Sequence, residues 1–186
     1  MAKDLGKIIE DAINKAIKDR GEVNVLIAGK TGVGKSTLIN AVFQGDFATT
    51  GQGKPVTQKT REIKKDGIPL TLFDTRGLEL EKYKETFEEL ETFVKNRNND
   101  SNPMKHIHMA WICIDEGSRR VEDAEIELCK LLSKYMPVIG VITKAVSDQG
   151  FRVKVLELLP NLKNAVRVNS ISEVLDDGHV IQASGL

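Results

Sequence analysis

Residues 29–36 spell Gly-Lys-Thr-Gly-Val-Gly-Lys-Ser, which is the phosphate-binding pattern G-x-x-x-x-G-K-[ST]. The pattern lies between an apolar run, Val23 to Ala28, and a stretch from Ser36 to Phe43 that reads as a helix. This strand–loop–helix context is the one that the pattern requires. A glycine-rich turn that carries Lys-Ser by chance is the alternative, but it leaves the rest of the pattern and its context unexplained. The sequence therefore predicts a polyphosphate site at the start of a helix.

Each residue type in this loop has a chemical reason. A triphosphate is highly anionic, and consecutive backbone N–H groups in a tight loop can surround it. Glycines permit the backbone angles and the close approach, and the start of the helix points its positive end at the phosphates. Lys35 supplies a point charge to the β- and γ-phosphates, and the Ser36 hydroxyl can ligate Mg²⁺. The residues expected to hold the nucleotide here are Gly29, Lys30, Thr31, Gly32, Val33, Gly34, Lys35, Ser36 and Thr37.

Strand-like and helix-like segments alternate along the rest of the chain. Apolar runs rich in β-branched residues read as strands, and segments with helical spacing lie between them. This alternation predicts a three-layer α/β domain with a mostly parallel sheet and helices on both faces. The expected strands are 23–28, 61–65, 68–73, 106–114, 137–143 and 165–168, and the expected helices are 36–43, 83–94, 121–132 and 153–159.

Two local features refine this picture. Asp66-Gly67 between strands 61–65 and 68–73 is a hairpin signal, so one edge strand of the sheet is expected to be antiparallel. Residues 45–59 show no periodicity and read as a loop, which is long for a connection inside a compact domain. A loop of this length indicates a functional role.

A second motif, Asp74-Thr75-Arg76-Gly77, ends the strand at 68–73. An Asp at that position can hold the Mg²⁺ shell, and the Gly77 N–H can sense the γ-phosphate. The pattern D-x-x-G is weak alone because many turns contain it. Some forty residues after the phosphate loop and at the end of the next strand pair, it becomes a strong indication of a nucleotide site.

At these two motifs the sequence resembles the P-loop GTPases of the translation-factor class. The loop is similar to that of septin, chloroplast-import and immunity-associated GTPases and of bacterial GTP-binding proteins of the ribosome-assembly type. The resemblance covers residues 23–170. It implies a Ras-like domain, GTP and GDP as ligands and Mg²⁺ as cofactor, with Ser36, Asp74 and a loop threonine as metal ligands.

In the resembled class, a threonine between the two motifs closes on Mg²⁺ and the γ-phosphate. Pro55-Val56-Thr57 resembles that site, so Thr57 is the first choice and Thr60 the second. A threonine in a solvated loop is the ordinary alternative for both.

The class also implies a guanine-reading motif of the form [NT]-K-x-D after a late strand. Thr143 and Lys144 match it, but Val146 stands where the class has an Asp that accepts hydrogen bonds from guanine. Asp148 could take that role if the loop bulges, and a solvent-facing or helix-capping Asp is the alternative. Asn169 and Ser170, after the last strand, match the final base-contacting loop of the class only weakly.

Hydrolysis is expected to be slow. Many GTPases of this class carry Gln after the D-x-x-G glycine to orient the attacking water, whereas this chain has Leu78. Members of the class with an apolar residue there use a dimer partner, an inserted arginine or K⁺. The P-loop Asn of the K⁺-dependent members is replaced here by Gly32, so K⁺ activation is not expected. The candidates for catalytic roles are Lys35, Thr57, Arg76 and Gly77, with Arg119 and Arg120 as further cations and surface arginines as the alternative reading.

Composition excludes some partners. Lys+Arg and Asp+Glu balance at 27 each, so bulk charge gives no reason to bind nucleic acid. The longest apolar run, Met109 to Ile114, is too short to cross a bilayer. The two cysteines, Cys113 and Cys129, read as reduced core residues. We therefore expect a protein of the cytoplasm without a membrane segment in this chain.

Residues 1–20 form a unit of their own in the sequence. Apolar residues from Leu5 to Ile17 recur at helical spacing with Lys and Asp between them, so an amphipathic helix is expected before Gly21. It either packs on the domain or contacts a partner or another segment. Residues 21–186 are expected to form the GTPase domain, without a clear C-terminal helix.

Three functions remain open from the sequence. The first is a GTP-hydrolysing switch, stimulated by a homodimer through the nucleotide face or by an effector. The second is a nucleotide-gated assembly module with negligible hydrolysis, which Leu78 supports. The third is an ATP-dependent enzyme such as a kinase, which Val146 supports, although no second substrate site is visible in the sequence.

Overall fold

The computed structural model describes residues 21–45, 54–55, 60–75, 83–174 and 180–185 of the 186-residue chain. The expected helix in residues 1–20 lies outside these ranges, as do Thr57, Arg76, Gly77 and Leu78.

A sheet of seven strands, in the order β2-β3-β4-β1-β5-β6-β7, forms the centre of the molecule. Strands β4, β1, β5, β6 and β7 are parallel to one another, and β3 runs antiparallel to β4. The antiparallel strand expected from Asp66-Gly67 is therefore confirmed, although the short β2 pairs outside it. The strands are β1 Val23–Ala28, β2 Lys54–Pro55, β3 Thr60–Lys64, β4 Leu70–Thr75, β5 Met109–Asp115, β6 Val138–Thr143 and β7 Asn164–Arg167.

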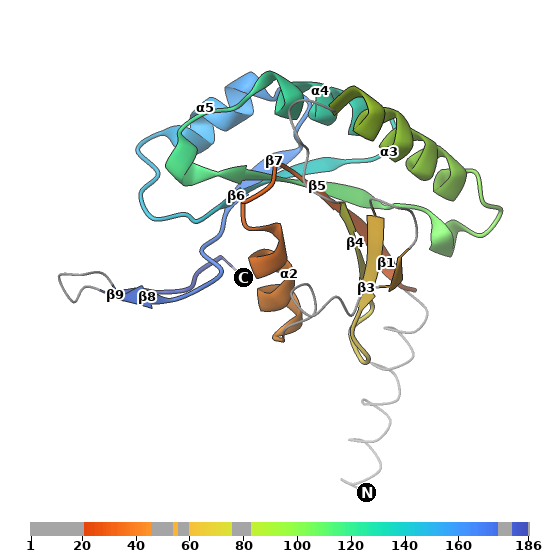
Figure 1. The fold of residues 1–186 in the computed structure, drawn as a ribbon, viewed down its shortest axis with the longest axis horizontal. Coiled ribbons are helices and arrows are strands. Elements are labelled where there is room, and N and C mark those ends of the chain that lie inside the picture. The colour runs from red at the N-terminus through yellow and green to blue at the C-terminus, as the bar shows by residue number, and fades with distance from the viewer. Residues whose placement is uncertain (1–20, 46–53, 56–59, 76–82, 175–179, 186) are drawn as a thin grey trace, which may run out of the picture.

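Helices cover both faces of the sheet, which confirms the three-layer α/β fold. Figure 1 shows α3, α4 and α5 together over one face and α2 against the other. A small hairpin, β8 with β9, extends from one end of the domain. The bounds are α2 Lys35–Phe43, α3 Tyr83–Asn98, α4 Asp123–Leu132 and α5 Phe151–Leu158, with 3₁₀ turns η2 Pro103–Lys105 and η3 Glu116–Ser118 and strands β8 Glu173–Val174 and β9 Val180–Ile181.

The central strand β1 shows why this sequence gives three layers. Successive side chains of a strand point to opposite faces. Leu26 and Ala28 join the core beneath α3, α4 and α5, whereas Val25 and Ile27 join the core beneath α2. All four are essentially inaccessible to solvent. A strand that is apolar on both faces is stable only between two layers, and each buried side chain of this size contributes about 1.5–3 kcal/mol.

Helix α3 is longer than the sequence predicts, because tertiary contacts hold its last turn. The helix continues to Asn98, whose Oδ1 accepts a hydrogen bond from the Ile107 N–H at 2.9 Å. The Arg97 guanidinium lies 4.6 Å from the Phe73 ring centroid and pairs with Glu62 at 3.3 Å. These partners come from β3, β4 and the segment before β5, so local composition did not reveal them.

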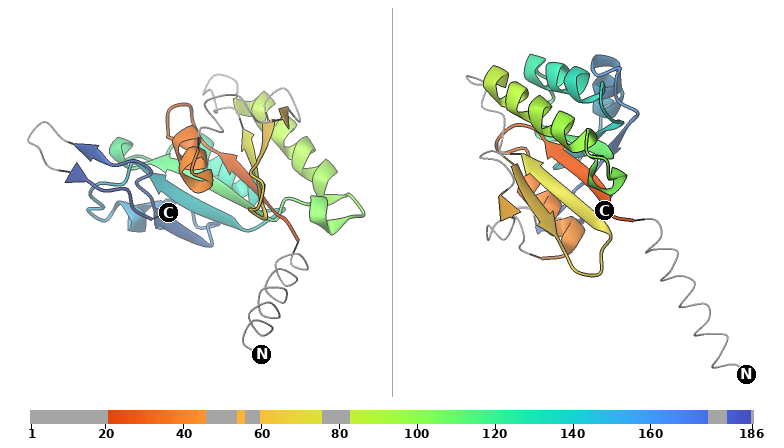
Figure 2. Two further views of the ribbon diagram at one scale, coloured as in Figure 1. Left: turned by 90° about the horizontal axis from the view of Figure 1, so that it is seen from below. Right: turned by 90° about the vertical axis from the view of Figure 1, so that its right-hand side faces the viewer.

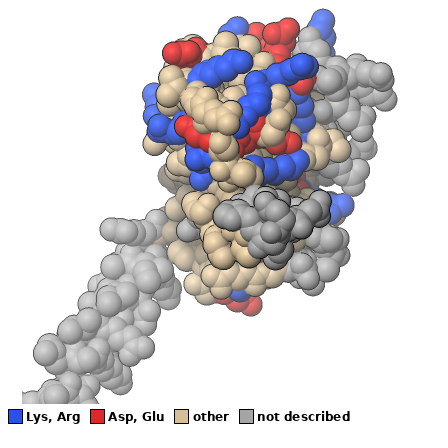
Figure 3. All heavy atoms as spheres, turned by 90° about the vertical axis from the view of Figure 1, so that its left-hand side faces the viewer, with Lys and Arg blue, Asp and Glu red and all other residues tan. Residues whose placement is uncertain are grey.

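Because β1, β4, β5 and β6 are parallel, their carboxyl ends lie on the same side of the sheet. The loops that carry the expected motifs begin there. Figure 2 shows the same arrangement from two further directions. On the side drawn in Figure 3, basic and acidic residues are interspersed and no large patch of one sign stands out. None of the described helices is long and apolar enough to span a membrane.

Candidate functional site

The phosphate loop adopts a conformation that depends on its glycines. Gly32 and Gly34 have φ values of 81° and 96°, a region that other residues rarely adopt. Gly34 is also the N-cap of α2, so the loop runs directly into the start of that helix. At Gly29, a side-chain Cβ would lie 2.7 Å from the carbonyl oxygen of Cys113. The loop therefore needs glycine both for its backbone angles and for its approach to β5.

Lys35 lies folded under this loop. Its side chain is buried, and Nζ donates to the carbonyl oxygens of Gly29 and Lys30, both at 2.8 Å. Burial lowers the pKa of Lys35, while the negative charge of Asp74 and the nearby Cys113 act in the opposite direction. The ammonium group is thus held at the loop by two neutral acceptors, which an anionic phosphate can replace.

Asp74 is the penultimate residue of β4 and lies beside the phosphate loop, because β4 pairs in parallel with β1 and places Asp74 opposite Ile27. Its Oδ1 is buried and has no hydrogen-bond partner among the described residues. Burial raises the pKa of Asp74, whereas Lys35 and Arg61 lower it. A buried carboxylate oxygen without a partner fits a hard divalent cation, which Asp74 and the exposed Ser36 would hold together with water.

A cavity of about 450 Å³ contains these groups, a size within the roughly 300–1,000 Å³ of small-molecule sites. Its lining joins the phosphate loop, the ends of β3 and β4, and the segment after β6. The residues are Thr31, Gly32, Gly34, Lys35, Ser36, Thr37, Arg61, Asp74, Thr75 and Lys144.

Arg61 is a charged lining residue that the sequence did not predict as part of the site. It lies opposite Asp74 in the antiparallel pairing of β3 with β4. A two-residue turn at Asp66-Gly67 would place Arg61 opposite Leu72. The observed connection from Lys65 to Pro69 shifts the register by two residues, so the sequence did not reveal that Arg61 pairs with Asp74. The sequence predicts residues 61–65 only as a strand.

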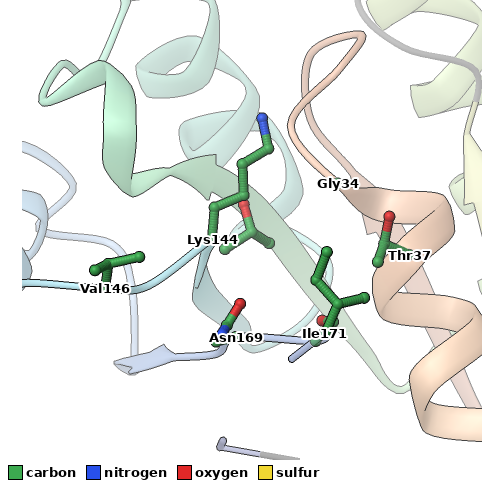
Figure 4. Close-up of a pocket in the computed structure, with 8 residues that line it drawn as sticks. Gly34, Thr37, Lys144, Val146, Asn169 and Ile171 are labelled. Atoms are coloured by element: carbon green, nitrogen blue, oxygen red, sulfur yellow. The ribbon is translucent and has the colours of Figure 1, made fainter. Parts of the chain in front are cut away.

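A second, smaller cavity of about 180 Å³ adjoins the first and shares Gly34, Thr37 and Lys144 with it. Figure 4 shows side chains from the loops after β6 and β7 on one side and from the start of α2 on the other. This cavity unites the two segments expected to contact the base. Its lining is Gly34, Thr37, Thr143, Lys144, Val146, Asn169, Ser170 and Ile171.

Thr143 and Lys144 occupy two different positions in this cavity. The buried hydroxyl of Thr143 lies within hydrogen-bond distance of the carbonyl oxygens of Val33 and Ile114, so it ties β6 to the phosphate loop and to β5. Lys144 has a φ of 52°, and its exposed side chain reaches Asp115 at 2.7 Å. The stem of Lys144 therefore forms a wall between the two cavities.

Asp148 is not among the residues that line either cavity, so the bulge expected to bring it to the base is not formed. Its Oδ1 accepts a hydrogen bond from the Arg152 N–H at 2.8 Å, within the first turn of α5. This is the helix-capping alternative, and its physical reason is that the first N–H groups of a helix lack partners within the helix. Val146, 61% exposed, stands at the cavity instead.

Asn169 and Ser170 do reach the smaller cavity. Asn169 is buried and held by the C-terminal segment: its N–H donates to Ser184 O at 2.9 Å and its side chain donates to Gln182 O at 3.1 Å. The cavity wall at residues 169–171 thus depends on contacts with the segment after β9. No local sequence pattern predicts these contacts.

The remaining candidates have other positions. Thr60, the second choice for the loop threonine, is buried in β3 and paired with Thr75. Arg119 faces the loop after β6, where it donates to Asp148 O at 2.6 Å and to Ser147 O. Arg120 is exposed and lines neither cavity.

Comparison with known proteins agrees with this geometry. The model of the 50S ribosome-binding GTPase family matches residues 24–144, from β1 to the loop that follows β6. The chain belongs to this GTPase family. The resemblance to P-loop GTPases that the two motifs suggested is therefore confirmed, and the phosphate cavity lies entirely within the matched residues of the GTPase domain.

Individual relatives of this GTPase chain come from two groups. The chain is 30% identical over 165 residues to neuronal-specific septin-3 of Rattus norvegicus, covering 74% of this chain and 46% of the relative. It is 28% identical over 172 residues to septin-9 of Homo sapiens, covering 76% and 28%. It is also 28% identical over 163 residues to the tRNA modification GTPase MnmE of Bordetella petrii, covering 85% and 34%. The aligned part is less than half the length of these curated relatives.

Proposed function

We propose that the chain is a GTP-binding switch that hydrolyses GTP slowly with Mg²⁺ and faster when it dimerises through the nucleotide face or meets an effector. One observation carries the proposal. Lys35 and Asp74, whose Oδ1 has no hydrogen-bond partner among the described residues, line a single cavity of about 450 Å³, which adjoins the smaller cavity of about 180 Å³. Membership of the GTPase family supports GTP as the nucleotide.

The chain's own residues supply the binding chemistry. The backbone N–H groups of the loop and of the start of α2 face the phosphates, and Lys35 exchanges its carbonyl acceptors for phosphate oxygens. Because Lys35 is already held under the loop, little side-chain entropy is lost on binding. Arg61 adds a further positive charge to the lining of this cavity.

Ser36 and Asp74 are the described residues that would hold Mg²⁺, with Thr57 as the proposed third ligand. When bound, the metal neutralises charge on the phosphate oxygens. Thr57 lies outside the described residues, as do Arg76 and Gly77. We propose that Gly77 contacts the γ-phosphate through its N–H and that Arg76 stabilises charge there.

Slow turnover follows from Leu78, which stands where many GTPases orient water with Gln. A leucine offers no hydrogen bond to water. A second protein molecule or an effector can supply the missing polar group, and this is the reason to propose stimulation on association.

The same residue favours one alternative function, a nucleotide-gated assembly module with negligible hydrolysis. In that case GTP binding alone changes the affinity for a partner. The two functions share the site and differ only in phosphate release.

The test combines calorimetry with phosphate release. GTP and ATP are titrated into the protein with excess Mg²⁺, and phosphate release is then followed at two protein concentrations. We expect tighter binding of GTP than of ATP and a rate per molecule that rises with protein concentration. Lys35→Ala should abolish triphosphate binding, whereas Lys130→Ala, at an exposed lysine of α4, should leave it unchanged.

Two results would contradict the proposal. Folded protein that takes up no triphosphate would end the case for a nucleotide switch. A fast rate that does not change with protein concentration would contradict stimulation by self-association, and binding without phosphate release at either concentration would favour the assembly module.

We further propose a cytoplasmic location and a GTPase domain that spans residues 21–186, with residues 1–20 as a separate helix. Cys113 and Cys129 are buried free thiols, as expected in a reducing compartment. Burial raises the pKa of the Cys113 thiol to about 12, so it is chemically inert.

A further inference from the structure

The loop after β6, residues 144–148, carries Lys144 and Val146 into the smaller cavity. Residues 144–148 lie between β6 and α5 and belong to neither. Lys144 has a left-handed φ of 52°, a conformation that is unfavourable for a residue with a side chain and persists only where surrounding contacts hold it. The shape of the proposed base site therefore depends on groups outside the loop.

Those groups come mainly from one short turn after β5. The Glu116 carboxylate accepts hydrogen bonds from the N–H groups of Val146 and Ser147, at 2.6 and 2.8 Å through Oε2. Arg119, three residues later, donates to the carbonyl oxygens of Ser147 and Asp148. The turn thus holds the loop in two ways: Glu116 accepts hydrogen bonds from its N–H groups, and Arg119 donates hydrogen bonds to its carbonyl oxygens.

Glu116 is buried, and its charge is neutralised within the protein. It is only 2% exposed, and its carboxylate is neutralised by Arg167 of β7, whose Nε lies 2.7 Å from Oε1. A buried carboxylate is costly unless it is paired and hydrogen-bonded, and here Arg167 and the two N–H groups meet that condition. The same carboxylate connects the turn after β5, the loop after β6 and strand β7.

We propose that Glu116 is a positioning residue for the base: it sets the loop that carries Lys144 and Val146 and so determines the affinity for the nucleoside part of the nucleotide. This inference rests on the proposed function of nucleotide binding. Glu116 lines neither cavity and touches no phosphate position, so its effect is separable from that of the phosphate loop. Because Val146 cannot accept a hydrogen bond from a base, the position of the Lys144 stem and of the loop backbone has more weight here.

The test compares two ligands that share phosphates and differ in the base. GTP and inorganic tripolyphosphate are titrated with Mg²⁺ into wild type and Glu116→Gln, with Glu127→Gln, an exposed residue of α4, as the matched control. Loss of a charge-assisted hydrogen bond should weaken GTP binding by about tenfold. Tripolyphosphate affinity should stay within about twofold, and amide exchange at Val146 and Ser147 should accelerate because their acceptor is weakened.

Arg119→Met provides a second variant in case Glu116→Gln does not fold. It removes the other contact to the same loop while it keeps the apolar stem beside Phe151, which lies 5.7 Å from the guanidinium carbon. The same selective loss for GTP is expected.

The outcomes separate this inference from the proposed function. Wild type that binds neither ligand would overturn both. Wild type that binds both ligands, with folded variants that bind GTP normally or lose GTP and tripolyphosphate equally, would overturn the positioning role and leave the proposed function standing.

Discussion

At the scale of single residues, the site rests on three charged side chains that come together around the phosphate cavity. Lys35 is buried and held by loop carbonyls, Asp74 has a buried oxygen with no hydrogen-bond partner in the described part of the chain, and Arg61 lies opposite Asp74 in the strand pair. Each arrangement leaves a charge whose interactions are incomplete until an anion or a cation arrives. The residue-scale predictions therefore concern ligand affinity.

Asp74→Asn should weaken the effect of Mg²⁺ on triphosphate binding. The amide keeps the size of the side chain but removes the negative charge that a divalent cation needs. We expect Mg²⁺ to improve GTP affinity in wild type and to improve it about tenfold less in the variant, the equivalent of about 1.4 kcal/mol. Calorimetry with Mg²⁺ and with EDTA measures the difference. Asp66→Asn, in the exposed hairpin turn, is the control, and an unchanged Mg²⁺ effect in Asp74→Asn would exclude Asp74 as a ligand.

Arg61→Gln should weaken GTP binding by less than Lys35→Ala does, by about three- to tenfold. Arg61 lines the cavity wall but is partly solvent-accessible, so its attraction for phosphate is screened by water and salt. The expected loss shrinks as ionic strength rises from about 0.05 to 0.5 M, because the Debye length falls. Arg120→Gln serves as control, since Arg120 lines neither cavity. Equal affinity of wild type and Arg61→Gln at low salt would contradict the role.

At the scale of elements, helices that pack on the sheet through fully buried side chains position the carboxyl ends of the strands. Helix α4 shows how this works. Leu128 and Leu132 are inaccessible to solvent and join the core shared with α3 and α5. The Glu125 carboxylate caps the first turn by accepting a hydrogen bond from the Glu122 N–H at 2.8 Å. Lys30 of the phosphate loop forms an ion pair with Glu122. The element is therefore fixed at its start and along one side.

Leu128→Ala should lower the free energy of unfolding by about 2–5 kcal/mol, because it removes buried methyl groups and leaves a cavity. Alanine is the better helix former, so the loss reflects packing and not helix propensity. Urea unfolding followed by circular dichroism measures it. Val153→Ala, at a 55% exposed position of α5, should change stability by less than about 0.5 kcal/mol. Similar urea midpoints of unfolding for Leu128→Ala and wild type would show that this core is not formed as described.

At the scale of the whole molecule, distant parts of the chain are joined by Glu116, which links the turn after β5, the loop after β6 and strand β7. Burial alone would raise the pKa of this carboxyl, but hydrogen bonds from Arg167 and from the N–H groups of Ser147 and Val146 outweigh it. The pKa of Glu116 in the folded protein therefore lies below its ordinary value.

A lowered folded-state pKa makes stability depend on pH in a defined direction. The contribution of Glu116 is fully present above the unfolded pKa of about 4.3 and is lost as pH falls through the folded value. Glu116→Gln should therefore be less stable than wild type at pH 7, and the difference should narrow as pH falls below about 4. Urea unfolding at a series of pH values tests this. A difference that stays constant in acid would mean that Glu116 is not ionised in the folded protein.

The sequence alone determined the strand from Val23 to Ala28, the phosphate loop, the antiparallel hairpin and the order of helices and strands. These features depend on local spacing: an apolar run, glycines at fixed positions, and an Asp-Gly turn. The end of α3 at Asn98 did not follow from local spacing, because contacts with Ile107, Phe73 and Glu62 hold it.

Only the tertiary structure decided how the cavities are completed. From the sequence, Asp148 could contact a base or cap a helix. In the structure it caps α5, because its side chain accepts a hydrogen bond from the Arg152 N–H. No role for Glu116 or Arg61 followed from the sequence. In the structure Glu116 is buried against the loop after β6 and Arg167, and the pairing of β3 with β4 places Arg61 opposite Asp74 at the phosphate cavity. The physical reason is that burial and hydrogen-bond partners arise from segments far apart in the chain, which no local pattern records.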